Sequence, residues 1–416
     1  MSAAKAGQGL ATARIRHCHH HLILQRLCRL GEISKAELAW AVRLNNTAIG
    51  RIFTDFQDFG LVSVIGKRYE GQGGHPGTAP RLKPNGGYGI GIRRDRRRME
   101  TALVDLGGCL SSPCSHEAAM PPLQETLAIA GADVEAFYET AEDQSPGRVL
   151  GIGLAGPYHL CAWLAPPPLD LNDPALKLWD DSNFAAAQQT GTGFDMLEEN
   201  DGTVAAIAEP FPCFGRECDD FAFFFLGPAI GGNVILHCDY RRCLSGNAGD
   251  VATLPVSRSI LASAPPVRGS YEVLLTRASM AALARHLTGH GHLVTELETL
   301  PTAIAACPQG FDEWLEDRVA ALISPLMAAQ TLLDVSSSVI DGDFGAEVMT
   351  GLTEGLRYRM GECPPEDRLT PSRRVGTFSS NARLLRAASL PLDFASRVAV
   401  GPNARPLKGG HDTRVA

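Results

Sequence analysis

From Gly87 onward, short apolar segments of strand character alternate with segments of helical periodicity, and this alternation constrains the fold more than any other feature of the chain. Strands are predicted over residues 88–94, 99–108, 148–156, 221–227 and 233–239. The first two are predicted to pair as a hairpin, and a helix near residues 123–141 is predicted to precede the third. This pattern is typical of an α/β domain. At 416 residues the chain is too long for a single core, so one or two further domains are expected.

Charge is divided unequally along the chain. Residues 1–98 contain 17 Lys and Arg against 6 Asp and Glu, a net charge of +11, whereas the whole chain has a net charge of −8. A basic segment on an acidic body predicts a module that binds a polyanion. The alternative is a solvated basic face without a partner.

Three short helices are predicted between residues 19 and 62. The second follows Ser34, which with Glu37 forms a capping box in the sequence. The third is predicted to begin at the N-cap Asn46 and to end at Gly60. A strand that leads into a β-wing is predicted after Gly60.

Two short helices joined by a tight turn are typical of proteins that place the second helix in the DNA major groove. In the third predicted helix the inner face consists of Ile49, Ile52, Phe53 and Phe56. Base contacts are predicted for Thr47, Ala48 and Arg51, and phosphate contacts for Lys35, Lys67 and Arg68. The alternative is a three-helix packing module that does not bind DNA.

The sequence shows neither a signal peptide nor a run of 18 apolar residues, and a cytoplasmic protein is therefore predicted. The 11 cysteines are expected to be reduced and mostly buried, because their spacing does not match Cys-x2-Cys zinc sites. The string GGYGIG lacks the full dinucleotide fingerprint, so no nucleotide cofactor is predicted.

Two groups of histidines have spacings that could suit a metal ion. His17 and residues 19–21 are interpreted as a solvated helix start, and His286, His290 and His292 as surface residues around a glycine turn. No metal site is predicted at either place.

Further motifs occur in a defined order between about residue 19 and about residue 395. They are SKAELA, GLV, ALVDLGG, GIGLAGP, LEENDGTVAAIAE, LGPAIGGNVI, SGNAGDVATLPV, VIDGDF and VGTFSSNARLLRAASLPL. As an ordered set they resemble the ROK family of repressors, open reading frames and kinases. The resemblance implies an α/β fold in which an N-terminal winged helix-turn-helix precedes a two-lobed, actin-like ATPase domain with a sugar cleft between its lobes. The predicted division is a flexible tail over 1–16, the winged helix-turn-helix over 17–72, a linker over 73–87, the two-lobed domain over 88–402 and a flexible tail over 403–416.

The phosphate loops depart from those of the family's kinases. The first, Asp-Ile-Gly-Gly-Thr-Lys in the kinases, falls on RRDRRR, which puts Arg93 at the aspartate and residues 95–97 at the glycines and threonine. The second reads LGPAIGG, with Pro228 and Ala229 in place of threonine and glycine. Proline removes an amide donor and alanine disfavours a positive φ, so phosphoryl transfer is not expected.

The ligand-binding positions of the family are partly retained. Asn200 and Asp201 match an Asn-Asp pair whose carboxylate is the catalytic base in the kinases, and the alternative role of Asp201 is to cap the following helix. Asn247 and Asp250 lie in GNAGDVAT, where the family has Gly-Asn-Ala-Gly-Glu-Ile-Gly-His. These four residues are predicted to contact a sugar.

The zinc segment that follows in the family is missing. Thr253 stands at the family's zinc-binding histidine, and Pro255 to Glu272 contains neither cysteine nor histidine. We therefore expect no zinc of that type and a loop that becomes ordered only when a ligand binds.

The resemblance predicts a sugar-responsive transcriptional regulator, a repressor, with a degenerate kinase site and no enzyme activity. Its expected partners are a double-stranded DNA operator, a sugar or sugar-phosphate effector and further copies of itself in a homodimer or homotetramer, without membrane contact. One alternative is an active ROK sugar kinase with a DNA-binding head, and another is a DNA-binding protein with a vestigial cleft. Gly74-His75-Pro76 replaces the Gly-Arg-Pro wing of many ROK repressors, which leaves minor-groove readout open.

Overall fold

The structure is a computed structural model. It describes residues 19–20, 23–24, 26–27, 33–68, 77–94, 98–117, 123–156, 183–194, 196–208, 220–236, 239–240, 249–267, 269–295, 299–335, 337–342, 344–361, 372–375 and 387–392.

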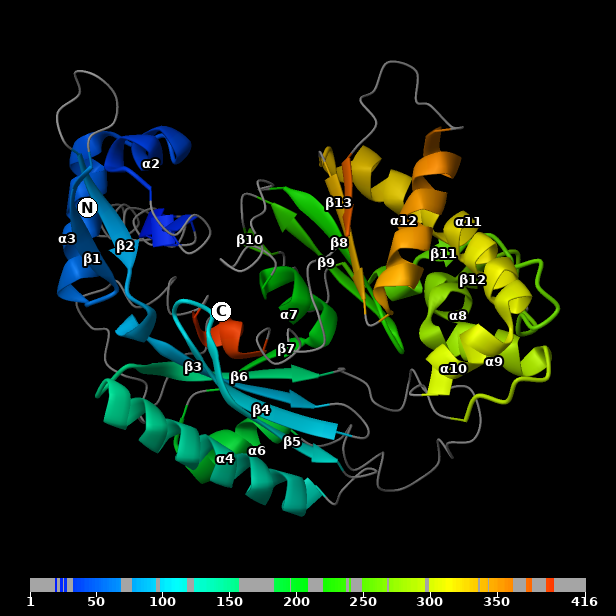
Figure 1. The fold of residues 1–416 in the computed structure, drawn as a ribbon, viewed down its shortest axis with the longest axis horizontal. Helices are drawn as coiled ribbons and strands as arrows, with labels where there is room; N and C mark the ends of the chain where they lie inside the picture. Colours follow the sequence, from blue (N-terminus) through cyan, green and yellow to red (C-terminus); the bar gives the residue numbers. More distant parts are fainter. Residues whose placement is uncertain are drawn as a thin grey trace, which may run out of the picture.

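Two five-stranded sheets with the same strand order form the centres of two lobes (Figure 1). The first sheet has the order β5-β4-β3-β6-β7 and the second β10-β9-β8-β13-β14. In each sheet one strand, β3 or β8, pairs antiparallel with the next strand in sequence and parallel with a strand that returns after a helical segment. The repeated order confirms the predicted two-lobed α/β architecture.

The strands of the first sheet are β3 (Tyr88–Arg94), β4 (Arg98–Asp105), β5 (Leu110–Glu117), β6 (Val149–Gly156) and β7 (Met196–Asn200). The helices α4 (Leu123–Gln144) and α6 (Phe184–Thr192) cover one face of this sheet (Figure 1). The predicted β3–β4 hairpin and the helix before β6 are confirmed. Their core consists of apolar side chains from β3, β4, β6, α4 and α6.

The second sheet contains β8 (Phe221–Leu226), β9 (Ile230–Leu236), β10 (Asp239–Tyr240), β13 (Ser337–Gly342) and β14 (Ser372–Val375). Every residue of β8 is buried, as expected for an apolar strand in the middle of a covered sheet. Helices pack on one face of the sheet: α8 (Leu274–Ala278), α9 (Met280–Gly289), α10 (Leu300–Ala306), α11 (Pro308–Leu333) and α12 (Ala346–Gly361). A small two-stranded sheet, β11 (Pro255–Val256) and β12 (Glu272–Val273), lies beside them.

The helix α7 (Asp201–Ala208) lies between the two sheets, because it follows β7 directly and packs against β9 (Figure 1). Beside it, a short helix over residues 387–392 covers the other face of the first sheet. This helix approaches β3 and β6 so closely that a β-carbon added at Gly91 or Gly153 would lie 2.5 or 2.0 Å from its backbone. The alternating glycines of YGIGI and GIGLAG therefore make room for a helix.

The N-terminal part consists of α2 (Lys35–Ala41), α3 (Asn46–Asp58) and a two-stranded antiparallel sheet of β1 (Val62–Arg68) and β2 (Gly77–Leu82). The capping box between Ser34 and Glu37 is confirmed. The predicted N-cap of α3 was wrong by one residue: the extended Asn45, whose Oδ1 accepts a hydrogen bond from the Ala48 amide at 2.8 Å, caps the helix. Strand β2 and the 3-10 turn Pro84–Gly86 occupy the segment that composition assigned to a linker.

The interpretation of residues 19–21 as a solvated helix start is wrong for His20. This side chain is fully buried, its Nε2 lies 2.9 Å from Asp55 Oδ2 of α3, and its ring packs edge-on against Phe56. His20 therefore attaches the first helical segment to α3. Local sequence patterns do not reveal this contact, because Asp55 lies 35 residues away from His20 in the sequence.

None of the helices among the described residues is long and apolar enough to cross a membrane. The described cysteines Cys109, Cys114 and Cys307 are free thiols, and of these Cys307 is buried while Cys109 is exposed. The expectation of buried cysteines holds for Cys307 and is wrong for Cys109.

Candidate functional site

The predicted sugar contacts begin where β7 ends and α7 starts. Asn200 is the last residue of β7, beside Gly156 at the end of the parallel strand β6, and Asp201 is the first residue of α7. Both side chains are half-buried. The Gly202 amide donates hydrogen bonds to Asn200 Oδ1 at 2.9 Å and to Asp201 Oδ1 at 2.8 Å. Asn200 Oδ1, which accepts from the amide two positions on, makes the contact typical of a helix N-cap, whereas Asp201 accepts from the amide of the residue that directly follows it.

Glycines bring a third predicted contact close to this junction. A β-carbon added at Gly202 would lie 2.7 Å from the Gly232 backbone nitrogen, and one added at Gly231 would lie 3.7 Å from Asn200 Oδ1. From the other side, Gly249 (φ +79°) packs on β9, where its added β-carbon would lie 2.5 Å from Asn233 Cα. Asp250 follows Gly249 directly and is half-buried. Asn200 and Asp201 thus lie beside Gly231 and Gly232 of β9, and Asp250 follows a glycine that packs on Asn233 of the same strand. Asn247 lies outside the described residues.

Strand β9 begins at Ile230, three residues earlier than predicted. The glycines that the resemblance places in a phosphate loop are paired strand residues here, because Gly231 and Gly232 lie opposite Phe225 and Phe224 of β8. The connection is a tight hairpin in which the Gly227 amide donates to the Ala229 carbonyl at 2.8 Å. None of its residues has a positive φ, so Pro228 and Ala229 fit without strain.

Two arginines, Arg93 and Arg94, lead into the first phosphate turn, and Arg93 stands at the family's aspartate. Arg93 Nη1 donates to Glu100 Oε2 at 2.9 Å, which pairs its charge with a carboxylate of β4. Arg94 is buried next to Gly156, with its guanidinium 5.3 Å from the centre of the Phe184 ring. Residues 95–97 lie outside the described part of the chain.

Glu198 of β7 adds a titratable group at this edge of the first sheet. Burial raises the pKa of its carboxyl, the nearby Arg94 opposes this change and Glu199 reinforces it. Sequence reasoning singled out neither Arg94 nor Glu198. Charged residues at the carboxyl ends of β3 and β7 were the available signal, since these ends share one sheet edge with Asn200.

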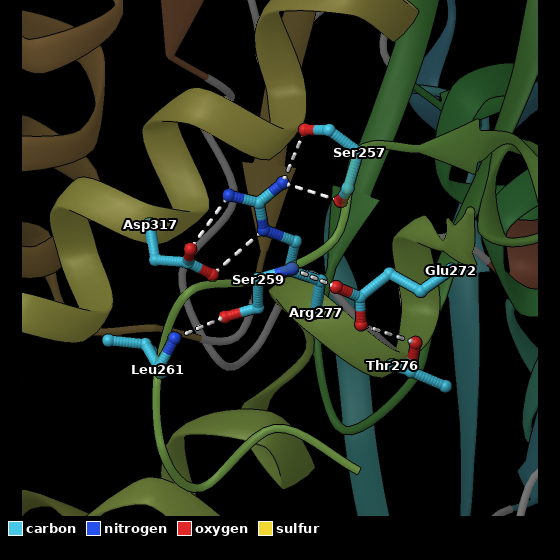
Figure 2. A network of polar contacts seen from close by, with 7 residues as sticks. All are labelled: Ser257, Ser259, Leu261, Glu272, Thr276, Arg277 and Asp317. Carbon is cyan, nitrogen blue, oxygen red and sulfur yellow. Dashed lines mark hydrogen bonds and ion pairs between the residues drawn. The ribbon is translucent and has the colours of Figure 1, made fainter. Parts of the chain in front are cut away.

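The segment without zinc ligands is held by a network of polar contacts around Arg277 (Figure 2). The Arg277 guanidinium donates to both carboxylate oxygens of Asp317 at 2.7 and 2.8 Å, and its Nη1 also donates to the carbonyl and hydroxyl oxygens of Ser257. Both charged side chains are almost fully buried. Glu272 accepts hydrogen bonds from the Ser259 amide and the Thr276 hydroxyl.

Two further arginines hold the same loop. Arg258 donates to the carbonyls of Val267 and Gly269, and Arg285 donates to the carbonyls of Ser263 and Thr276. The expectation of a loop that becomes ordered only with a ligand is therefore wrong. Arg277 and Arg285, from the two helices that follow the loop, and Asp317, from the distant helix α11, provide cross-links where the resemblance implies a metal ion in the family.

The predicted DNA contacts on α3 lie on one side of the helix. Thr47 and Arg51 are exposed, Ala48 is half-buried, and the predicted inner face of four apolar residues is buried. Lys35 begins α2, and its ammonium lies 5.5 Å from the centre of the Phe53 ring. Lys67 and Arg68 are the last two residues of β1. The arrangement of two helices and a hairpin exposes a basic side chain at the N-terminal half of the second helix.

The N-terminal part shares a core with the first lobe. Apolar residues of α2 and α3 pack in one cluster with Val104, Leu106 and Leu392. The Phe59 carbonyl, at the end of α3, accepts a hydrogen bond from Arg148, which directly precedes β6. Strand β6 therefore starts next to the N-terminal part, directly after Arg148, and ends at Gly156, on the sheet edge that carries Asn200.

No family model matches the chain. An uncharacterized protein of Sinorhizobium fredii, y4fQ, is 24% identical over 377 residues, which cover 89% of this chain and 91% of that protein. The xylose repressor of Bacillus spizizenii is 22% identical over 248 residues, which cover 58% of this chain and 61% of the repressor.

Among solved structures, a ROK family transcriptional regulator that is a homologue of the E. coli MLC protein matches with a TM-score of 0.63 at 18% identity, over 92% of this chain and 98% of that chain. The chain has the ROK fold. The ROK hexokinase from Thermus thermophilus has the same fold, with a TM-score of 0.53 at 19% identity over 72% of this chain and 96% of its own. The resemblance to the ROK family is thus confirmed at the level of the fold.

Proposed function

We propose that the protein is a sugar-responsive, DNA-binding transcriptional repressor of the ROK type. The observation that carries this proposal is the extent of the structural matches. The ROK regulator matches 92% of this chain, whereas the ROK hexokinase matches 72% of it although 96% of the hexokinase is used. Much of the part of this chain that has no counterpart in the ROK hexokinase is matched by the ROK regulator.

The geometry of the N-terminal part supports a winged helix-turn-helix. Helix α3 has a buried apolar face and an outer face that carries Thr47 and Arg51, and β1 and β2 form a hairpin where a wing is expected. A recognition helix that enters the major groove contacts base edges with such outer residues. Heads of this type work in pairs on half-sites about one helical turn apart, so we propose a homodimer or homotetramer.

The contacts between the head and the first lobe supply a route for the sugar signal. Strand β6 starts beside Arg148, which holds the end of α3, and ends at Gly156, beside Asn200. The helix over 387–392 packs on the head through Ala388 and Leu392 and on α7 through its other side. A ligand that shifts α7 or the edge of the first sheet would therefore move the head.

The same geometry argues against phosphoryl transfer. Arg93 is paired with Glu100 and Arg94 is buried against Phe184, so two bulky charged side chains stand at the end of β3, where the family's kinases begin their first phosphate loop. The second loop is a closed hairpin that contains Pro228. Because ROK kinases share this fold, an assay for sugar phosphorylation tests the enzyme alternative directly.

The first prediction concerns DNA. We expect Arg51→Ala to cost about 1–3 kcal/mol of specific binding to the intergenic region upstream of the gene, because a bidentate contact to guanine contributes about that much. Fluorescence anisotropy with operator and scrambled duplexes at one salt concentration measures it. Gln57→Ala, at the exposed C-terminal half of α3, is the matched control and should bind as the parent does.

Lys67→Ala should weaken binding to both duplexes alike and reduce the salt dependence of the affinity. Equal specificity of parent and Arg51→Ala would refute the recognition helix.

The second prediction concerns the effector. We expect a sugar or sugar phosphate, from a panel that includes glucose, xylose, N-acetylglucosamine and N-acetylmannosamine, to raise the melting temperature by mass action. The rise should disappear in Asp250→Ala and in Asp201→Ala and persist in a chelator, since both carboxylates lie around β9 and can accept from vicinal hydroxyls. Glu316→Ala, an exposed carboxylate of α11, is the control and should retain the rise.

Two outcomes would favour the alternatives. If any sugar supports ADP release at about 10 per second, and if Asp201→Ala abolishes this release, the protein is an active kinase with a DNA-binding head. A rise that survives loss of both Asp201 and Asp250, or no rise with any sugar, would indicate a vestigial cleft.

A further inference from the structure

A cluster of two histidines and a glutamate lies between α9 and α11 of the second lobe, and it joins one buried side chain to two that are accessible to solvent. His286 lies in α9 and His290 immediately follows this helix, one turn further along. Glu313 faces them from α11, with its Oε2 3.2 Å from His290 Nε2 and 3.6 Å from His286 Nε2. The interpretation of His286 as a surface residue is wrong, because only 3% of it is exposed.

Neighbouring side chains hold the remaining polar atoms of the cluster. His286 Nδ1 lies 2.7 Å from Ser263 Oγ, and Glu313 Oε1 accepts a hydrogen bond from Gln309 Nε2 at 2.9 Å. These contacts turn His286 Nε2 and Glu313 Oε2 toward the same point. Metal sites in proteins use such outer contacts to orient histidine and carboxylate ligands.

The atom that indicates a bound ligand most directly is His286 Nε2. It is buried and has no hydrogen-bond partner of good geometry, and buried nitrogens without partners are rare in folded proteins. Burial and the neighbouring His290 lower the pKa of His286, while Glu313 and the Gly310 carbonyl act in the opposite direction. A neutral imidazole with its Nδ1 held by a hydroxyl is the form that donates a lone pair to a metal.

We propose that His286, His290 and Glu313 bind a divalent transition-metal ion, zinc above all. With ligand bonds of about 2.0–2.2 Å, the edges of a tetrahedral site are about 3.3–3.6 Å long, close to the two nitrogen–oxygen distances here. The three ligand atoms lie within 4.8 Å of one another. The side chain of Glu313 is 40% exposed, so a water molecule can complete the coordination and ions can enter from solvent.

The surrounding backbone is shaped for this cluster. A β-carbon added at Gly310 would lie 3.2 Å from His290 Cδ2 and 2.8 Å from Cys307 Sγ, so glycine lets the imidazole lie against the first turn of α11. A metal ion here would tie α9 to α11 and, through Ser263, to the loop that Arg277 and Glu272 also hold. Its ligands lie outside the segment from Pro255 to Glu272.

Zinc titration of the full-length chain tests this proposal. Because residues 17–21 read His-Cys-His-His-His, the parent for the experiment carries alanine at 17, 18, 19 and 21, which leaves the buried His20 in place. Bound zinc after dialysis and competition with a chromophoric chelator are measured for His290→Ala, Glu313→Gln and Ser263→Ala. His292→Ala, a nearby histidine outside the cluster, is the matched control.

We expect the parent to hold about one zinc ion per chain. His290→Ala and Glu313→Gln should lose at least a factor of about ten in affinity, and Ser263→Ala should lose about 10–100-fold, as for other outer contacts. His292→Ala should bind as the parent does. Since His290 and Glu313 are solvent-accessible, circular dichroism should show folded variants. A parent without bound zinc, variants that bind as the parent does, or an equal loss in His292→Ala would each overturn the assignment.

Discussion

Replacement of Asp317 by alanine should destabilise the second lobe by about 3–5 kcal/mol, because it leaves the Arg277 guanidinium buried without its carboxylate. Both side chains are at most 4% exposed and are joined by two hydrogen bonds of 2.7 and 2.8 Å. Urea unfolding followed by tryptophan fluorescence measures the loss, with Trp314 of α11 as a reporter in the same lobe. Hydrogen exchange should also show reduced protection of the Ser259 amide.

Two controls separate the ion pair from general effects on α11. Glu316→Ala removes an exposed carboxylate one residue away and should change stability by no more than about 0.5 kcal/mol. Arg277→Met with Asp317→Leu removes both charges and should recover most of the loss, since a buried pair is often replaceable by apolar residues. A loss below about 1 kcal/mol in Asp317→Ala would show that the pair does not hold this loop.

Replacement of Arg318 by methionine should instead stabilise the protein, by about 1–4 kcal/mol at pH 7. Arg318 is fully buried, and its Nε, Nη1 and Nη2 have no hydrogen-bond partner among the described residues. Its guanidinium lies 4.7 and 4.1 Å from the ring centres of Trp314 and Phe344, but two cation–π contacts of about 2 kcal/mol each do not offset the desolvation of a charge with several unsatisfied donors.

The pH dependence gives a second readout for Arg318. Burial lowers the pKa of its guanidinium to about 9, well below the pKa of an exposed arginine. Between these values the unfolded chain binds more protons than the folded one, so the contribution of Arg318 becomes less unfavourable as the pH rises above 9. The gain from Arg318→Met should therefore be constant from pH 7 to 8.5 and shrink at pH 10.

Arg318→Lys is the matched control, because it keeps a buried charge and loses the planar stacking group, and it should give no gain. Parallel urea titrations of the three proteins at each pH provide the comparison. A loss of stability in Arg318→Met would mean that an acceptor from outside the described residues satisfies the guanidinium, and the expected gain would then be refuted.

Local signals were sufficient for several strands of the two lobes and for the helices of the N-terminal part. Alternating apolar runs predicted β3, β4, β6 and β8, and the capping box at Ser34 predicted the start of α2. The inner face of α3 followed from helical periodicity. These features depend on residues a few positions apart, so the sequence contains the whole of the interaction. The ordered motifs likewise indicated the ROK fold.

Tertiary packing decided what local patterns left open. Glycines read as a possible phosphate loop, Gly231 and Gly232, are strand residues that admit α7 and Gly249 on either side. Burial of His20 and His286 is tolerated because Asp55 and Ser263, which lie 35 and 23 residues away in the sequence, provide partners for their ring nitrogens. The loop after Pro255 is ordered because Asp317, from a different helix, neutralises Arg277. Burial and pairing are properties of surfaces that meet only in the folded chain, so spacing along the sequence does not determine them.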